Sequence, residues 1–523
     1  MKDAHVDRVG ERSESALLGR GELQRRAVAG SFWTAAHALV AAPLAFVVNA
    51  VVARVLGPAE YGGLALLTLA LGIATQLSNL GVSDATIQWG AAAAVRGARD
   101  EVARLLSKSL GFHVVVQLPL LVATVLVLAR NDGFIAAVLV LSVVLPAALG
   151  SAALLITIEN RTASGAKLAM LSNLIVQVGI LGAALTTESP AWVWAVRALA
   201  GSLLLPLNFL LLDAWGRRAA RTIALPRHMP NGFWHFAAAT MAAGIAGMLV
   251  FSRSEIVALG WFSDPAVVGL FALAFGVAAQ VTAPVDALMG PLAPAAAGLV
   301  SGHPRQIRAG RERAVRASAF LSGAVLAVVV PPLMVAVPLL YGAAYTEARV
   351  PLLILSATSC LQSVCGPLVA FANARRQAGK VLRITMVALV VDVVLALVLI
   401  PKLDLVGALA ANSGGQLTFL VLLIRLEAAN ERQSWLRVAA STRAWGVGLA
   451  AALVAISVSS LSSTYTAVAG VASAFSGALV YLLGVRMFRA GMTEADWQAL
   501  GGALPAPMRP PIRWAAILFG ARS

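Results

Sequence analysis

Charged side chains inside otherwise apolar segments are the residues of this chain that could do chemistry. Arg253 and Glu255 flank one serine in such a segment, and Arg197 stands in another. A guanidinium group binds phosphate-type anions through forked donors, whereas a buried carboxyl group can relay a proton or bind a sodium ion. Because an arginine in hydrocarbon costs about 2.5–3.5 kcal/mol, each needs a partner or water. The carboxyl candidates for ion coupling are Glu255, Asp286, Asp84 and Asp392.

Each of these charges also has a structural interpretation. Arg253 could pair with the nearby Glu255, and Arg197 could brace two helices. Arg54 ends its apolar segment, where an interfacial anchor is the simpler interpretation, although it stays a candidate for substrate binding. Asp392 could be an acid that hydrogen-bonds between packed helices. The sequence leaves both interpretations open at each position.

Uncharged polar residues extend the set of candidates. Their side chains could line a path for a sugar, or each could form a hydrogen bond between helices. Prolines near Asp286 break the helix and expose carbonyl groups, which favours an ion site or a hinge there. The polar candidates are Gln76, Gln280, Asn49, Asn79, Asn373, Asn412 and Gln416.

Long apolar segments must hold all of these residues. Hydrophobic residues make up 59% of the 523 residues, charged residues 12%, and the mean hydropathy is +0.84, which exceeds what a soluble core needs. About fourteen segments reach the roughly 20 residues that span about 30 Å of hydrocarbon. The sequence therefore predicts an all-α polytopic membrane protein with about fourteen transmembrane helices.

The basic residues predict how these helices are oriented. Clusters of Arg and Lys occur before the first segment and after every second one, and 34 of the 40 fall on that side. The positive-inside rule places this side in the cytoplasm, so both termini are expected there, in a bacterial inner membrane. Loops that face anionic lipid explain the net charge of +16, and nucleic-acid binding is not expected.

Internal repetition predicts two lobes. Leu69–Leu77 and Leu273–Val281 match at five of nine positions with an offset of 204, and Phe32-Trp33 and Phe233-Trp234 open their segments 201 residues apart. Six spans separate the copies, so the repeat is parallel, and two six-helix lobes around a central cavity follow, with two extra C-terminal helices.

The expected divisions are a cytoplasmic tail at 1–29, an N-lobe at 30–212, a basic linker at 213–234, a C-lobe at 235–425, a cytoplasmic loop at 426–442, two further helices at 443–485 and a cytoplasmic tail at 486–523.

Several classes of protein are disfavoured. The sequence has no phosphate-binding G-x-x-x-x-G-K-[ST] loop, no H-E-x-x-H and no G-x-S-x-G motif, so we expect no enzyme, no cofactor and no metal centre. Cys360 and Cys365 share one apolar segment and are expected to be packing residues. The outer turns, such as Leu56–Tyr61 and Pro401–Asp404, are too short for an extracytoplasmic catalytic domain. This disfavours a membrane glycan ligase or polymerase.

Three stretches resemble a known family. Ala53–Gly62, followed by Asn79-Leu80-Gly81 and Asp84-Ala85, is similar to the N-terminal signature of bacterial polysaccharide and O-antigen flippases of the multidrug/oligosaccharidyl-lipid/polysaccharide exporter superfamily. Two more stretches, Leu259–Ala274 and Leu399–Ala410, are similar as well. The family often places an acidic residue before a basic one in the seventh segment. This chain reverses that order in Arg253-Ser254-Glu255, so the resemblance alone does not assign ion coupling there.

The resemblance implies transport of a polyprenyl-pyrophosphate-linked oligosaccharide between leaflets, coupled to H+ or Na+ or driven by removal of product. Arg253 and Arg197 would then bind the pyrophosphate. Polysaccharide polymerase and chain-length proteins are the expected partners besides the membrane. A flippase for the peptidoglycan lipid precursor and a multidrug antiporter are the alternatives within the superfamily.

Overall fold

The computed structural model describes residues 20–128, 133–159, 161–248, 254–289, 304–375, 377–431, 434–460, 467–494 and 496–497. Within these ranges the chain forms helices and no strand. Eight of the described helices are long and apolar enough to cross a membrane, or up to ten if each of two bent helix pairs is one span. The protein is therefore an all-helical multi-pass membrane protein, as predicted, and the count of fourteen spans stays a prediction.

The chain divides into two compact units. Unit 1 comprises Met1–Val55 and Leu67–Ile245, and unit 2 comprises Leu56–Leu66 and Ala246–Ser523. Its first helix thus contributes to both units. The lobe and linker boundaries expected from the sequence stay predictions.

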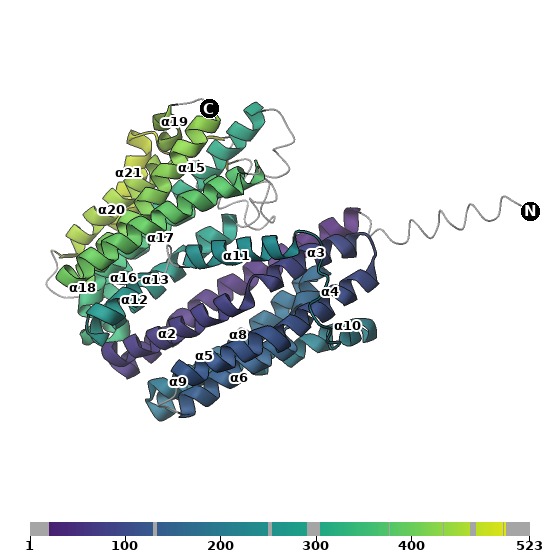
Figure 1. Cartoon of the computed structure of the whole chain (residues 1–523). Coiled ribbons are helices and arrows are strands. Elements are labelled where there is room, and N and C mark those ends of the chain that lie inside the picture. The colour runs from purple at the N-terminus through teal and green to yellow at the C-terminus, as the bar shows by residue number, and fades with distance from the viewer. Residues whose placement is uncertain are drawn as a thin grey trace, which may run out of the picture. The chain divides into compact units, whose positions relative to one another are not determined.

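The helices up to residue 248 begin with α2, which is shared between the units. They are α2 (Arg20–Asn79), α3 (Val82–Val95), α4 (Arg99–Phe112), η1 (His113–Gln117), α5 (Leu118–Leu128), α6 (Gly133–Leu149), α7 (Ser151–Ile158), α8 (Thr162–Thr187), α9 (Pro190–Leu203), η2 (Leu205–Leu211), α10 (Ala214–Ala219) and α11 (Phe233–Met248) (Figure 1).

The remaining helices belong to unit 2. They are α12 (Ser254–Phe262), α13 (Pro265–Met289), α15 (Pro304–Val328), α16 (Val330–Tyr341), η4 (Ala343–Ala348), α17 (Arg349–Ala374), α18 (Ala378–Asn430), α19 (Trp435–Ala440), α20 (Arg443–Ser460) and α21 (Ala467–Met487).

Two long helices each contain a sharp break. In α2 the break is Gly57, with φ 73° and ψ 172°, and in α18 it is Asp404, with φ 45° and ψ −120°. Glycine adopts a positive φ without steric cost, and a hydrogen bond from Ser263 Oγ to Asp404 Oδ1, 2.9 Å long, holds the second break. Both breaks fall in outer turns that the sequence predicts.

The glycines of the family signature allow a close helix contact within unit 2. A Cβ at Gly62 would lie 2.1 Å from the carbonyl oxygen of Pro265, and a Cβ at Gly269 would lie 1.9 Å from that of Pro58. Backbones can approach this closely only where side chains are missing. The segment Leu56–Leu66 therefore docks on the start of α13 because both surfaces carry glycine.

The core of unit 2 is a tight bundle in which α15 and α17 pack on each other and on α20 (Figure 1). Phe320, Leu361, Leu423 and Tyr481 belong to one buried apolar cluster, and the Tyr481 hydroxyl donates to the Phe320 carbonyl at 2.7 Å. Cys360 and Cys365 on α17 are buried free cysteines, and Cys365 belongs to the same apolar cluster, which is the environment expected of packing residues.

Gly477→Ala is expected to destabilise this bundle. Its new Cβ would lie 1.8 Å from the carbonyl oxygen of Ala327, so α21 must move away from α15 at a cost of about 1–3 kcal/mol. The melting temperature of the purified protein in detergent would measure this. Gly470→Ala on the same helix is the control, because its Cβ meets only Pro332 Cβ at 3.9 Å. Equal melting temperatures for the two variants would contradict the prediction.

Candidate functional site

A buried polar cluster in unit 2 is the strongest candidate for a functional site. Glu255 lies in the first turn of α12, Asp392 lies before the break in α18, and Asn412 and Gln416 lie after it. Glu255 and Asp392 are both 0% exposed, and the two amide residues are 2% exposed. Four polar side chains thus converge inside a helical bundle where each unpaired group costs free energy.

Hydrogen bonds connect the two carboxyl groups of this cluster. Ser254 Oγ donates to Glu255 Oε2 at 3.1 Å and also contacts Asp392 Oδ2, and Asn412 Nδ2 donates to Glu255 Oε1 at 2.8 Å. Ser254 Oγ therefore lies between the two carboxyl groups. A serine hydroxyl has a single proton, so it can donate to only one of them at a time.

Asp392 Oδ1 is buried and has no hydrogen-bond partner among the described residues. Gln416 Oε1, one helical turn after Asn412 on α18, is likewise buried without a partner in this part of the chain. Within the same ranges no basic side chain forms an ion pair with either carboxyl group, and Arg253, the cation nearest in sequence, lies outside them. Two carboxyl groups in contact cannot both stay ionised without a compensating charge. The cluster is therefore suited to holding a proton or a small hard cation among oxygen ligands.

The break in α18 brings the members of the cluster together. Asp392 precedes Asp404 by about as many residues as Gly415 follows it. The two halves of α18 therefore bring Asp392 and Gly415 to the same level. A Cβ at Gly415 would lie 2.8 Å from Asp392 Cβ and 3.3 Å from Asp392 Oδ1. Glycine at 415 thus makes room for the carboxyl group.

The other carboxyl candidates lie elsewhere. Asp286 on α13 accepts a 2.6 Å hydrogen bond from Ser363 Oγ of α17 and is partly exposed. Asp84 is exposed in the first turn of α3. Only Glu255 and Asp392 of the four predicted acids come into contact.

The predicted substrate-binding residues do not form one described cluster. Arg197 on α9 and Arg54 on α2 are exposed, and Asn49 and Gln280 are half-buried on α2 and α13. Arg253 and the side chain of Gln76 lie outside the described residues.

Comparison with known proteins shows the family of this chain. The family model described as "Polysaccharide biosynthesis protein" matches residues 51–350. The chain belongs to this family. No match was found among curated protein sequences.

Two solved structures share the fold. The inward closed conformation of the lipid II flippase MurJ is 11% identical, with a TM-score of 0.62, over 87% of this chain and 98% of that one. The inward-facing conformation of a multidrug resistance MATE family transporter of the MOP superfamily is 14% identical, with a TM-score of 0.53, over 78% of this chain and 99% of that one. This polysaccharide biosynthesis protein therefore has the fold of MOP-superfamily transporters.

This family member has a second buried charge cluster, which the sequence motifs do not indicate. Arg311 of α15 forms two hydrogen bonds with Glu431 of 2.8 and 2.9 Å, and Arg375 bonds Glu427 at 2.6 Å and Glu431 at 2.9 Å. Arg311 and Glu427 are both 0% exposed. Arg308 and Glu312 also form ion pairs with this cluster, so its three arginines and three glutamates balance in charge. The cluster ties the ends of α15, α17 and α18 together.

Proposed function

We propose that this protein is a flippase that moves a polyprenyl-pyrophosphate-linked oligosaccharide from the inner to the outer leaflet of a bacterial cytoplasmic membrane, for cell-surface polysaccharide biosynthesis. The observation that carries the proposal is the family match over residues 51–350 on a chain with a MOP transporter fold. A sugar head and a pyrophosphate cannot cross hydrocarbon unaided, so a polar path is needed. Alternating access of two lobes would provide it.

Ion coupling through Glu255 and Asp392 is part of the proposal. Their contact, their burial and the unpartnered oxygens beside them support a site that binds H+ or Na+. Binding would neutralise the pair and so bias unit 2 toward one conformation. A gradient-driven transporter requires this coupling between ion binding and conformation.

The topology completes the proposal. Both termini and the even-numbered loops are proposed to lie in the cytoplasm, and the basic clusters of the sequence support this orientation. Arg253 and Arg197 are the proposed contacts of the pyrophosphate, and polar residues such as Gln280 and Asn49 are proposed to face the sugar path.

Leaflet-resolved measurement of lipid-linked oligosaccharide in cells that lack this protein tests the proposal. We expect accumulation on the cytoplasmic leaflet that the native chain reverses and Arg253→Ala does not. Rescue by both chains would make Arg253 a structural residue. Absence of any accumulation would contradict flipping by this protein.

Flipping of the peptidoglycan lipid precursor is the second candidate, because the lipid II flippase MurJ shares the fold. The same cells distinguish the two. Accumulation of lipid-linked muropeptide instead of oligosaccharide would favour the second candidate, and drug sensitivity without lipid accumulation would favour an antiporter.

A further inference from the structure

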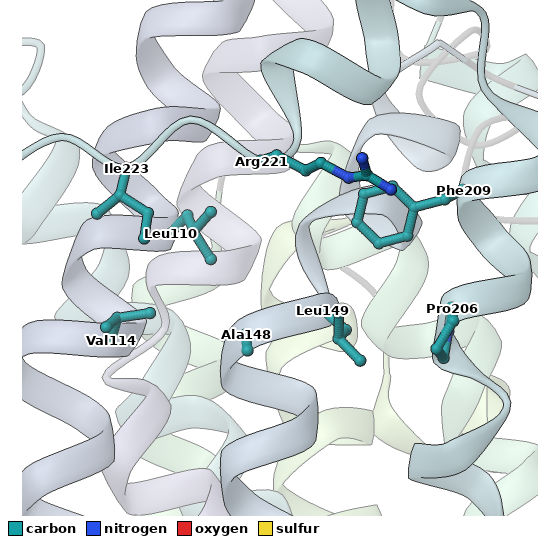
Figure 2. A pocket seen from close by; sticks show the side chains of 8 residues that line it. All are labelled: Leu110, Val114, Ala148, Leu149, Pro206, Phe209, Arg221 and Ile223. Carbon is teal, nitrogen blue, oxygen red and sulfur yellow. The ribbon is translucent and has the colours of Figure 1, made fainter.

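A cavity of about 240 Å³ lies within unit 1, between the helices and the segment that follows α10 (Figure 2). Seven of its eight lining residues are apolar, and the eighth is an arginine. The lining residues are Leu110, Val114, Ala148, Leu149, Pro206, Phe209, Arg221 and Ile223.

The segment that carries Arg221 and Ile223 is fixed on both sides. Before it, Ser151 Oγ donates to the carbonyl oxygen of Ala220 at 2.5 Å, and after it the Ala224 amide donates to the carbonyl oxygen of Ser107 at 3.0 Å. Gly111 allows this approach, because a Cβ there would lie 1.8 Å from the Ala224 carbonyl oxygen. The wall of the cavity is therefore built by specific contacts.

The guanidinium of Arg221 lies over the ring of Phe209, 5.1 Å from its centroid, at the rim of the apolar lining (Figure 2). No carboxylate forms an ion pair with Arg221 in the part of the chain that the structure describes. Arg217 and Arg218 in the last turn of α10 are exposed as well. An apolar cavity thus opens beside cations that lack an anion.

The size of the cavity and the chemistry of its lining together limit which molecules can bind in it. Sites for drug-sized ligands usually enclose about 300–1,000 Å³, so a cavity of about 240 Å³ holds only part of a molecule as large as a lipid. The remainder must lie outside, in the surrounding bilayer or its headgroup layer. A hydrocarbon chain fits the apolar lining, and an anionic headgroup fits Arg221. Basic pockets between transmembrane helices on the cytoplasmic side are suited to acidic lipid headgroups.

We propose that this cavity binds a membrane phospholipid with an anionic headgroup, with a segment of acyl chain between α4, α6 and η2 and the phosphate at Arg221. The site lies beside the basic segment after α10, which the charge pattern assigns to the cytoplasmic leaflet. It is separate from the Glu255 and Asp392 cluster of unit 2, so it stands whether or not the flippase proposal holds.

Native mass spectrometry of the full-length purified protein, titrated with phosphatidylglycerol or phosphatidylethanolamine, tests the proposal. The native chain should prefer phosphatidylglycerol, and Arg221→Gln should lose about fivefold of that preference, the factor expected from one basic residue near an anionic surface. Ala148→Trp fills the cavity and leaves Arg221 in place, so it should weaken binding of both lipids.

Arg425→Gln is the matched control, because Arg425 is an exposed arginine at the end of α18 in unit 2. It should leave the preference unchanged. Unchanged preference in Arg221→Gln, equal loss in Arg425→Gln, or unchanged lipid binding in Ala148→Trp would each overturn the proposal. All variants are compared at the elution volume of the native chain, which excludes misfolding.

Discussion

Asp392→Asn should lower gradient-driven transport by about 10- to 100-fold while the protein keeps its thermal stability. Losing a carboxylate from an ion site costs affinity of that order. The same change removes the repulsion between two buried carboxyl groups, so folding should be unaffected or improved. Transport into proteoliposomes under a Na+ or pH gradient, with the melting temperature of the same preparation, would measure both. A loss of transport without a loss of stability separates an ion site from a structural hydrogen bond.

Two aspartate variants serve as controls for this result. Asp264→Asn changes an exposed acid of an outer turn and should transport like the native chain. Asp84→Asn tests the competing candidate on α3. If Asp392→Asn still transports at the native rate, or melts several degrees lower than the native chain in K+ buffer without Na+, the pair is structural and the ion-coupling proposal is wrong.

Ligand-dependent stability identifies the ion. A ligand that binds only the folded protein stabilises it by RT ln(1 + [L]/Kd), about 2.7 kcal/mol at a hundredfold excess over Kd. A sodium site predicts a higher melting temperature in Na+ than in K+ for the native chain and no difference for Asp392→Asn. A proton site predicts no Na+ effect in either.

The helical architecture is predictable from the sequence because lipid imposes it. Apolar runs must be helices in a membrane, and turn residues such as Gly57 and Asp404 stand where the helices break. In the sequence, the glycines of the signature indicate only a resemblance to a family. The structure shows why glycine is needed there, because Gly62 and Gly269 lie directly against opposing carbonyl groups.

The candidate site could be predicted only in part. Glu255 and Asp392 were named separately, but their contact depends on how α12 packs on the halves of α18, which no local pattern encodes. The run Asn412-Ser413-Gly414-Gly415-Gln416 inside an apolar span was the available signal, since small and polar residues there make room for a buried carboxyl group.

The Arg311 cluster was missed for a different reason. Arg311 and Arg375 belong to basic stretches of the sequence, and the positive-inside pattern indicates only that such charges face anionic lipid in the cytoplasm. The spacing of Glu427 and Glu431, four apart on one helix face, was the signal that they have partners.

Glu427→Ala should destabilise the protein by about 3–5 kcal/mol, because it removes one of the two carboxylates that Arg311, which is 0% exposed, and the half-buried Arg375 share. Glu431 then serves both arginines, and Arg311 keeps only the more exposed Glu312 besides. Unfolding in denaturing detergent would measure the loss. Glu101→Ala is the matched control: its ion pair with Arg96 is exposed, so at most about 1 kcal/mol should be lost.

A double variant tests why Glu427→Ala lowers the stability of the protein. In Arg375→Met/Glu427→Leu the charges stay balanced, and the two hydrogen bonds between Arg311 and Glu431 remain. Replacing a buried ion pair by apolar side chains of similar volume is often neutral, so this double variant should recover most of the stability that Glu427→Ala loses. If it is no more stable than Glu427→Ala, neither the uncompensated arginine charge nor a cavity explains the penalty, which then comes from the lost hydrogen bonds of Glu427 and Arg375. The comparison thus decides whether these hydrogen bonds are needed to hold α15, α17 and α18 together at this end of unit 2.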